Sequence, residues 1–255
     1  MKARRFVTPV VLFLAAGCAS ARAEGIAGKF TIMVQAGTQS EVSGTAIAAA
    51  SGTMAGKPAT IDEKRYRDLY GAALRVQGAV GYGVAPKLEL FARGSYYEPK
   101  VNAIQVGTFD GHEMFACFEP GSGSTGTSCG PLKTKEWGAE LGLRFYIVPQ
   151  SRLKSYLAAV GGVRHNDELL VSFSAPDAGS AVLHVPFSQG GTVAVFGADL
   201  GVLFDITPSF FVGVDTGIRW QQGPNGFGAL PGMAGWDEHS GRWTSPVLGT
   251  IGVRF

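Results

Sequence analysis

The sequence predicts an all-β fold, an eight-stranded antiparallel transmembrane β-barrel. The chain of 255 residues is 45% hydrophobic and 16% charged, with a mean hydropathy of +0.14, which excludes a disordered chain. No uninterrupted apolar run beyond residue 20 reaches the ~18 residues of a membrane helix. Polarity instead alternates with a period of two over stretches long enough for tilted membrane strands of ~9–11 residues. Because every backbone group in hydrocarbon needs a partner, such a chain is expected to close into a barrel in a bacterial outer membrane.

Residues 1–23 are predicted to be an export signal that precedes the barrel domain, residues 24–255. The start is positively charged, the apolar stretch 6–16 is too short to span a bilayer, and Ala21-Arg22-Ala23 fits a cleavage site. A second kind of processing stays open, because Ala15-Ala16-Gly17-Cys18 resembles a lipobox. Ala15 stands there in place of the usual Leu, and a barrel needs no extra anchor.

The net charge and the cysteines limit which binding partners the chain is expected to have. The formal net charge is +2, yet residues 1–23 contain four basic residues and no acid, so the remaining chain carries −2. Without a basic stripe, no nucleic-acid partner is expected. Cys117 and Cys129 lie in one Gly/Ser-rich segment, and in an oxidising export compartment the simplest expectation is a disulfide between them. Two thiols do not complete a four-ligand zinc site, so no metal is expected.

Eight alternating stretches are predicted as strands. Their ranges are 29–37, 68–83, 88–97, 135–148, 153–171, 191–206, 210–221 and 243–255. The fourth stretch has a continuous outward face, because Trp137, Ala139 and Leu141 begin a run at every second position. The fifth has the least defined register, because the adjacent Gly161 and Gly162 blur the alternation.

The connections between these strands alternate in length. Three short turns, 84–87, 149–152 and 207–209, each contain a proline, which cannot donate to a ladder. Four long loops lie between them, at 38–67, 98–134, 172–190 and 222–242. Short turns face the periplasm in outer-membrane barrels, so an even strand number places both termini there.

The last stretch carries a further signal. Val247, Gly249, Ile251, Val253 and Phe255 share one face, and Phe255 is the final residue. This pattern resembles the C-terminal recognition signal of outer-membrane barrels, so Val253 and Phe255 are expected to act as the assembly signal. The chain as a whole resembles the small eight-stranded outer-membrane barrels of the OmpA-transmembrane or OmpX-like type, in pattern and topology rather than in a unique motif. No peptidoglycan-binding domain and no cell-wall anchoring are expected.

A soluble barrel such as a lipocalin is the main structural alternative. It would bury apolar side chains inside and show polar ones outside. Here the charges lie on the minority face of each strand, while the other face is a continuous apolar band that would aggregate in water. The alternation therefore favours the membrane barrel.

The inward face of the predicted barrel is charged. Its members are Lys29, Arg75, Gln77, Glu89, Arg93, Glu140, Arg144, Lys154, Arg164, Asp199, Asp215, Arg219 and Arg254. Strand order is expected to place Glu89 and Arg93 beside Glu140 and Arg144, Asp199 beside Asp215 and Arg219, and Arg254 near Lys29. Buried charges must pair, and an eight-stranded barrel is only just wide enough for its own side chains, so a salt-bridged plug is expected. A narrow ion path lined by the same charges is the alternative.

No catalytic site is expected. Small outer-membrane enzymes that modify lipid need a histidine paired with serine or an acid near the lipid edge. His112, His184 and His239 lie in long loops and His165 at a strand end, and the neighbours His239 and Ser240 would face opposite sides of a strand. No Gly-rich phosphate loop leads a helix, so no nucleotide or organic cofactor is expected.

The long loops are the expected carriers of specificity. Loop 38–67 is rich in Ala, Ser, Thr and Gly and is expected to be mobile. Loop 98–134 holds a group of large apolar residues near the cysteines that either form a recognition tip or pack on the barrel rim or the lipid interface. These residues are Phe109, Met114, Phe115 and Phe118. The last loop holds Phe227, Met233 and Trp236, of which Trp236 is a candidate for an aromatic girdle.

The prediction is thus an outer-membrane protein without catalysis, with a structural or surface-recognition role carried by its loops. A small porin-like channel for ions or solutes is the alternative. The expected partners are outer-membrane lipid, lipopolysaccharide, the barrel-assembly machinery and an extracellular ligand at the loops.

Overall fold

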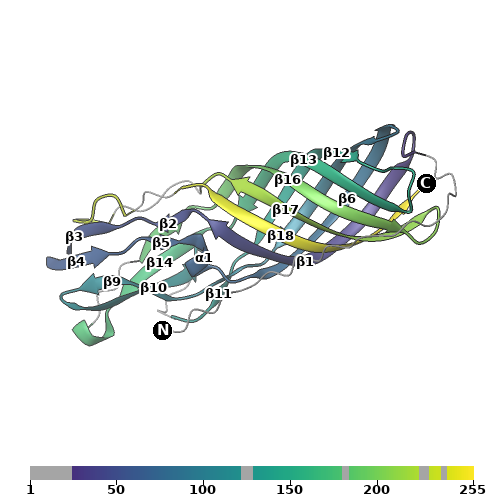
Figure 1. Ribbon diagram of the computed structural model, residues 1–255. Helices are drawn as coiled ribbons and strands as arrows, with labels where there is room; N and C mark the ends of the chain where they lie inside the picture. The colour runs from purple at the N-terminus through teal and green to yellow at the C-terminus, as the bar shows by residue number, and fades with distance from the viewer. Residues whose placement is uncertain (1–24, 122–128, 180–183, 224–229, 237–239) are drawn as a thin grey trace.

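The computed structural model describes residues 25–121, 129–179, 184–223, 230–236 and 240–255. The predicted export signal, residues 1–23, lies outside this part of the chain. Eight antiparallel strands close into a barrel in which each strand pairs with the next along the chain and the last pairs with the first (Figure 1). They are β1 (Phe30–Ser43), β6 (Ala73–Ala85), β7 (Leu88–Tyr97), β12 (Glu136–Tyr146), β13 (Leu153–Asn166), β16 (Gly191–Asp205), β17 (Phe210–Gln221) and β18 (Arg242–Arg254). The predicted fold class is confirmed.

The barrel wall separates apolar from polar side chains, as the period of two requires. Outward positions are apolar and exposed, for example Leu141 at 65% and Leu74 at 61%. Aromatic residues bound this belt at both ends. Those at one end are Tyr96, Trp137, Trp220 and Trp243, and those at the other are Phe30, Tyr82, Phe145, Phe204, Phe210 and Phe255. An apolar band between two aromatic girdles is the lipid-facing surface of a transmembrane barrel.

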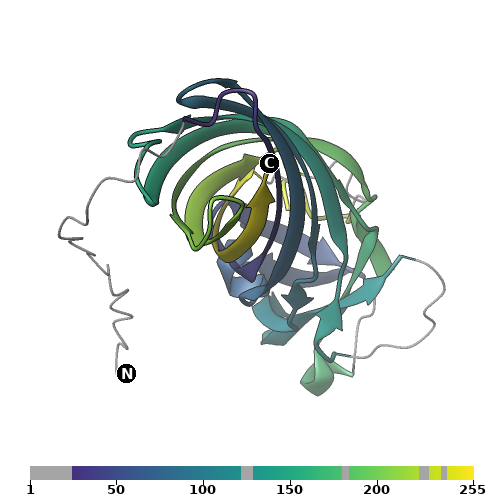
Figure 2. The ribbon, with the colours of Figure 1, turned by 90° about the vertical axis from the view of Figure 1, so that its right-hand side faces the viewer.

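The three predicted short turns lie together at the end of the barrel that carries the C-terminus, which Figure 2 views directly. The barrel closes at this end through reciprocal backbone hydrogen bonds between Phe30 and Phe255, of 2.8 and 3.0 Å. We call this the short-turn end. Among the described residues, no helix is long and apolar enough to cross a membrane.

Three strand boundaries differ from the prediction by more than two residues. β1 continues past Gly37 to Ser43, because Gln39 and Glu41 keep the inward alternation although the outward residues turn polar. β6 begins at Ala73 rather than residue 68, because Tyr66–Leu69 form a short helix, α1. β13 ends at Asn166, and Leu169–Ser174 form a separate strand, β14.

The four long connections fold together into a second β-structure, visible at the left of Figure 1. A six-stranded sheet, here called the distal sheet, has the order β15-β14-β10-β9-β4-β3. Besides β14, its strands are β3 (Ala50–Met54), β4 (Lys57–Ile61), β9 (Ile104–Phe109), β10 (His112–Pro120) and β15 (His184–Ser188). Two short ladders accompany it, β2 (Thr45–Ile47) with β5 (Lys64–Arg65) and β8 (Lys100–Val101) with β11 (Leu132–Lys133).

The distal sheet has a hydrophobic core of its own. Its largest members include Phe118, Phe173 and Trp236, and the Phe173 and Trp236 rings meet edge to face at 5.7 Å. Buried aromatic side chains remove large apolar areas from water and so contribute strongly to the stability of a core. This core can therefore hold the long connections in one fold.

Several predictions for the loops were wrong. Loop 38–67 is not a mobile segment, because most of it forms strands that pair with one another and with β9. Phe109, Met114 and Phe118 form neither an exposed tip nor a rim contact, because all three are buried in the distal core. Trp236 is 2% exposed in the same core and therefore does not belong to an aromatic girdle. Phe227 lies outside the described residues.

Candidate functional site

The barrel interior contains a network of ion pairs centred on Glu140 of β12. Glu140 accepts hydrogen bonds from three guanidinium groups on three other strands. Arg93 Nε lies 3.0 Å from Glu140 Oε2, and Arg93 Nη2 contacts the same oxygen. Arg75 Nη2 lies 3.2 Å from Oε1, and Arg219 Nε lies 3.3 Å from Oε2. Glu140 and Arg93 are direct ladder partners, so strand register alone places their inward side chains together.

Asp199 of β16 extends this network across the barrel. It accepts hydrogen bonds from Arg93 Nη1 at 2.8 Å and from Arg219 Nη2 at 2.5 Å. Arg93 and Arg219 therefore each bridge the same two carboxylates, Glu140 and Asp199. The four side chains, from β7, β12, β16 and β17, form a ring of ion pairs in which each charge lies between two charges of the opposite sign.

A second pair lies closer to the short-turn end. Arg144 Nη1 lies 2.8 Å from Glu89 Oε2, and the Tyr146 hydroxyl donates to the same oxygen at 2.6 Å. The Arg144 guanidinium also lies over the rings of Phe91 and Tyr156, at 4.7 and 4.5 Å from their centres. Aromatic faces stabilise a cation that has left water, which suits this narrow interior.

Asp215 lies near Asp199, and Arg254 stands on the strand beside the one that follows Lys29, as strand order predicts, but the direct contacts of Asp215 and Arg254 are with other residues. Asp215 does not lie in an ion pair with Arg219. It accepts hydrogen bonds from Gln35, from the Tyr156 hydroxyl at 3.0 Å and from Thr250 at 3.3 Å. Arg254 lies 3.5 Å from Asp205, and Asp205 also pairs with Lys154. The ladder partner of Arg254 is Thr31.

The opposite end of the barrel holds a group that the sequence prediction missed, built around Arg242. Arg242 Nη2 lies 2.5 Å from Glu136 Oε1, and Nη1 lies 3.5 Å from Glu41 Oε1. Glu136 Oε2 lies 3.6 Å from Arg164. Glu41 and Arg242 lie in ranges that were predicted as loops. The sequence signal that could have found them is the alternation of inward positions, which continues from Gln39 to Glu41 and includes Arg242 just before Trp243.

Helix α1 covers this end of the barrel. The Arg242 guanidinium lies 5.6 Å from the ring centres of both Tyr66 and Tyr70. Burial raises the pKa of each phenol well above its usual value, so both hydroxyls stay neutral in the physiological range. The two rings are tilted at 35° to each other and cover Arg242 without adding charge beside it.

The interior is packed rather than water-filled. Arg75 is 0% exposed, Arg219 1%, Glu140 3% and Asp199 5%, although a charged wall of an aqueous pore would be accessible to water. The apolar side chains of Met33, Phe91, Tyr146, Tyr156, Leu203 and Phe211 fill the short-turn half. Among the described residues, no group of three or more His, Cys, Asp or Glu side chains could hold a metal ion.

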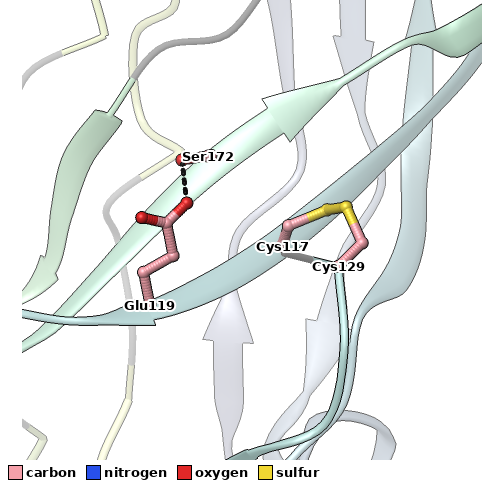
Figure 3. Close-up of a disulfide and its surroundings, with 4 residues drawn as sticks. All are labelled: Cys117, Glu119, Cys129 and Ser172. Atoms are coloured by element: carbon pink, nitrogen blue, oxygen red, sulfur yellow. Dashed lines mark hydrogen bonds between the residues drawn. A yellow bond between two sulfur atoms is a disulfide. The ribbon is translucent and has the colours of Figure 1, made fainter. Parts of the chain in front are cut away.

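The predicted disulfide is present in the distal sheet. Cys117 of β10 is bonded to Cys129, with 4.7 Å between their Cα atoms (Figure 3). On the same face of the sheet, the Ser172 hydroxyl donates to Glu119 at 3.1 Å, and both side chains are buried. The disulfide therefore ties residue 129 to the face of β10 that carries Glu119.

The remaining predicted site residues lie outside this interior. Val253 and Phe255 point outward on the closing strand, and the Phe255 ring lies 6.2 Å from that of Phe30. Their role in assembly stays a prediction. His165 stacks on Trp137 at 5.0 Å on the lipid-facing side, His112 is exposed, and His239 lies outside the described residues.

Three features together identify the architecture: a closed wall of strands, an apolar outer belt, and a charged, packed interior. The chain has the fold of a small outer-membrane β-barrel. No model of a known protein family and no curated protein matches its sequence. Among solved structures, it is similar to Neisserial surface protein A, with 12% identity, 89% of this chain and 99% of that chain covered, and a TM-score of 0.43.

Two further outer-membrane structures show a similar degree of likeness. The outer membrane protein OprG from Pseudomonas aeruginosa has 12% identity, covers 92% of this chain and 99% of its own, and has a TM-score of 0.43. The outer membrane protease OmpT from Escherichia coli has 7% identity, covers 89% and 97%, and has a TM-score of 0.39. At these values the likeness concerns the fold alone, so function must be argued from this chain's own residues.

Proposed function

We propose that this protein is a membrane-anchored recognition protein in which a closed barrel carries the distal sheet outside the membrane. The observation that supports this most is the division of the distal sheet into an apolar face and a polar face. The apolar face forms the distal core, whereas the polar face on β3, β4 and β9 has no covering layer among the described residues.

The polar face is rich in hydroxyl groups. Ser51, Thr60, Thr108 and Glu113 follow one another across four adjacent strands and are all exposed. Thr60 and Thr108 share a hydrogen bond of 2.8 Å between their hydroxyl oxygens. A flat surface of hydroxyl groups on a stable sheet offers both donors and acceptors to a polar ligand such as a glycan or an extended peptide.

The filled interior supports the anchoring role of the barrel. A channel would need a continuous water path, whereas the interior charges are nearly inaccessible to water and are neutralised by one another. Under this proposal the ion pairs hold the barrel in one shape, and the distal sheet is presented at a fixed height above the membrane.

Display on bacterial cells tests the recognition role. Cells that carry the protein would be applied to arrays of glycans and extracellular-matrix proteins, together with cells that carry the double variant Thr60→Glu/Thr108→Glu. We expect the wild type to bind one ligand class and the double variant to lose this binding, because a ligand that covers the two introduced carboxylates would have to remove their water. Thr207→Glu at the short-turn end serves as the matched control and should bind as the wild type does. Binding that survives Thr60→Glu/Thr108→Glu, or no binding to any array component, would contradict the proposal.

A further inference from the structure

The lipid-facing wall of the barrel contains a hollow of about 670 Å³ across β1, β6, β7, β12 and β13. Its floor consists of small residues on adjacent strands. These are Gly78, Gly94, Ala139 and Gly161. Gly78 pairs with Gly94, and Gly94 pairs with Ala139, so three neighbouring strands have no side chain larger than a methyl group at this level. Val80 and Leu141, which project outward at the next level, bound the hollow on the side of the short-turn end.

The hollow is open toward the lipid. A Cβ atom added at Gly78 would meet no atom within 4 Å, and one added at Gly94 would meet only the Gly138 carbonyl oxygen, at 4.0 Å. Inside a membrane this space is too large to stay unfilled without losing dispersion contacts. Its lining is largely apolar, and its two charged members, Arg93 and Glu140, are paired with each other inside the barrel. A hydrocarbon chain is the occupant that this chemistry fits.

A cluster of lysines lies beyond the membrane belt, on the segments that follow β7 and precede β12 in the chain. Lys100 of β8 and Lys133 of β11 are direct ladder partners, and Lys135 is the next outward residue after Lys133. Like charges directly opposite each other in a ladder destabilise it. Glu98 pairs with Lys133 at 2.7 Å and also interacts electrostatically with Lys135, whereas Lys100 takes part in no ion pair with another described residue. We call Lys100, Lys133 and Lys135 the lysine ledge.

The hollow and the lysine ledge are aligned along the strands. On β12 and its extension, the outward positions run from Ala139 through Trp137 to Lys135 and Lys133. Four residues from Ala139 to Lys135 span about 13 Å of strand. One leaflet of hydrocarbon is about 15 Å thick, so the hollow lies at the depth of an acyl chain and the ledge at the depth of a headgroup. Trp137 stands between them, at the interface where Trp is enriched.

We infer that the hollow and the lysine ledge together bind one membrane lipid that has a phosphate headgroup, in the leaflet nearest the distal sheet. An acyl chain fills the hollow over Gly94 and Ala139, and the phosphate lies between Lys100 and Lys135. This inference rests on insertion of the barrel in a membrane, but it does not depend on the recognition role of the distal sheet.

Quenching of Trp137 fluorescence tests this site directly. The protein would be reconstituted in phosphatidylcholine vesicles in a background with Trp220→Phe and Trp243→Phe, which leaves Trp137 as the tryptophan that faces lipid, because Trp236 is in the distal core. Phosphatidic acid with brominated chains is then added at increasing mole fraction. We expect half-maximal quenching at a much lower mole fraction than brominated phosphatidylcholine requires.

Variants separate the two parts of the site. Lys100→Gln/Lys135→Gln should raise the half-quenching mole fraction toward the phosphatidylcholine value, by up to about 25-fold at about fivefold per lysine. Gly94→Leu should fill the hollow and lower the maximal quenching. Lys57→Gln, at the tip of the distal sheet, is the charge control. Gly249→Leu is the control for the hollow, because Gly249 faces lipid on another part of the wall with only an ordinary contact of 3.7 Å.

Three results would overturn the inference. Equal quenching by brominated phosphatidic acid and phosphatidylcholine would exclude a selective site. Displacement by inorganic phosphate with no effect of Gly94→Leu would show a bare anion site instead of a lipid site. Conversion of a dimer to a monomer by Gly94→Leu, measured by sedimentation in detergent, would assign the hollow to a second copy of the chain.

Discussion

Glu140→Ala is the substitution that tests the interior network most sharply. The carboxylate accepts from Arg75, Arg93 and Arg219, and all four residues are buried. Charge-assisted hydrogen bonds contribute about 1.5–3 kcal/mol each, but their full sum is not lost, because Arg93 and Arg219 keep Asp199 as a partner. Arg75 loses its one carboxylate contact among the described residues and keeps only Gln77 and Gln39. The free energy of unfolding should therefore fall by about 3–5 kcal/mol, the usual cost of stranding a buried charge.

The assay is urea unfolding of the protein folded in phospholipid vesicles, followed by tryptophan fluorescence. A second variant makes the interpretation specific, because Glu140→Ala/Arg75→Met removes the stranded guanidinium as well. The double variant should be more stable than Glu140→Ala alone by at least about 1 kcal/mol. Glu98→Ala, which breaks the exposed pair with Lys133, is the matched control and should unfold close to the wild type. A Glu140→Ala midpoint equal to that of the wild type, or a double variant less stable than both single variants, would refute the role assigned to the network.

Three further predictions concern the distal sheet and helix α1. Cys117→Ser/Cys129→Ser should destabilise this sheet by about 3 kcal/mol, because the bond closes a loop of twelve residues, and limited proteolysis should then cut between them while the barrel keeps its heat-dependent gel mobility. Phe173→Ala should cost about 3–5 kcal/mol by leaving a cavity beside Trp236, seen as a red shift of the Trp236 emission, whereas an unchanged spectrum would argue against the packed core. Because burial raises the pKa of Tyr66, the folded state holds that proton more tightly than the unfolded chain, so stability should fall as pH rises above about 10. The thermal midpoint of the Trp236 signal measures this loss, which should be smaller in Tyr66→Phe.

The membrane strands were predictable because the bilayer imposes a strict pattern on them. Each strand must show lipid an apolar residue at every second position, so residues such as Trp137, Leu141 and Phe145 mark register as well as location. Where a strand leaves the membrane this constraint ends. Thr38 and Ser40 are polar although β1 continues, and Glu41 was therefore placed in a loop.

The distal sheet was not predictable in the same way. Its pairings join segments far apart in the chain, such as Ala59 with Phe109, and short strands in Ser- and Gly-rich sequence carry little signal of their own. Cys117 and Cys129 were the exception, because the export compartment itself favours their bond. In the interior, the pairs of Glu89 with Arg144 and of Arg93 with Glu140 follow from strand order. The convergence of three guanidinium groups on Glu140 follows from barrel closure, which brings β17 across to β12. The absence of catalysis stays a prediction.

The conductance of the folded protein tests the central claim most directly. The protein would be inserted in a planar bilayer, after the heat-dependent shift in gel mobility has shown that the barrel is folded. The packed interior around Glu140, Asp199 and Arg219 predicts no current steps above the bare bilayer. Discrete, reproducible steps that change in ion selectivity with Asp199→Asn would contradict the account and identify the barrel as a channel.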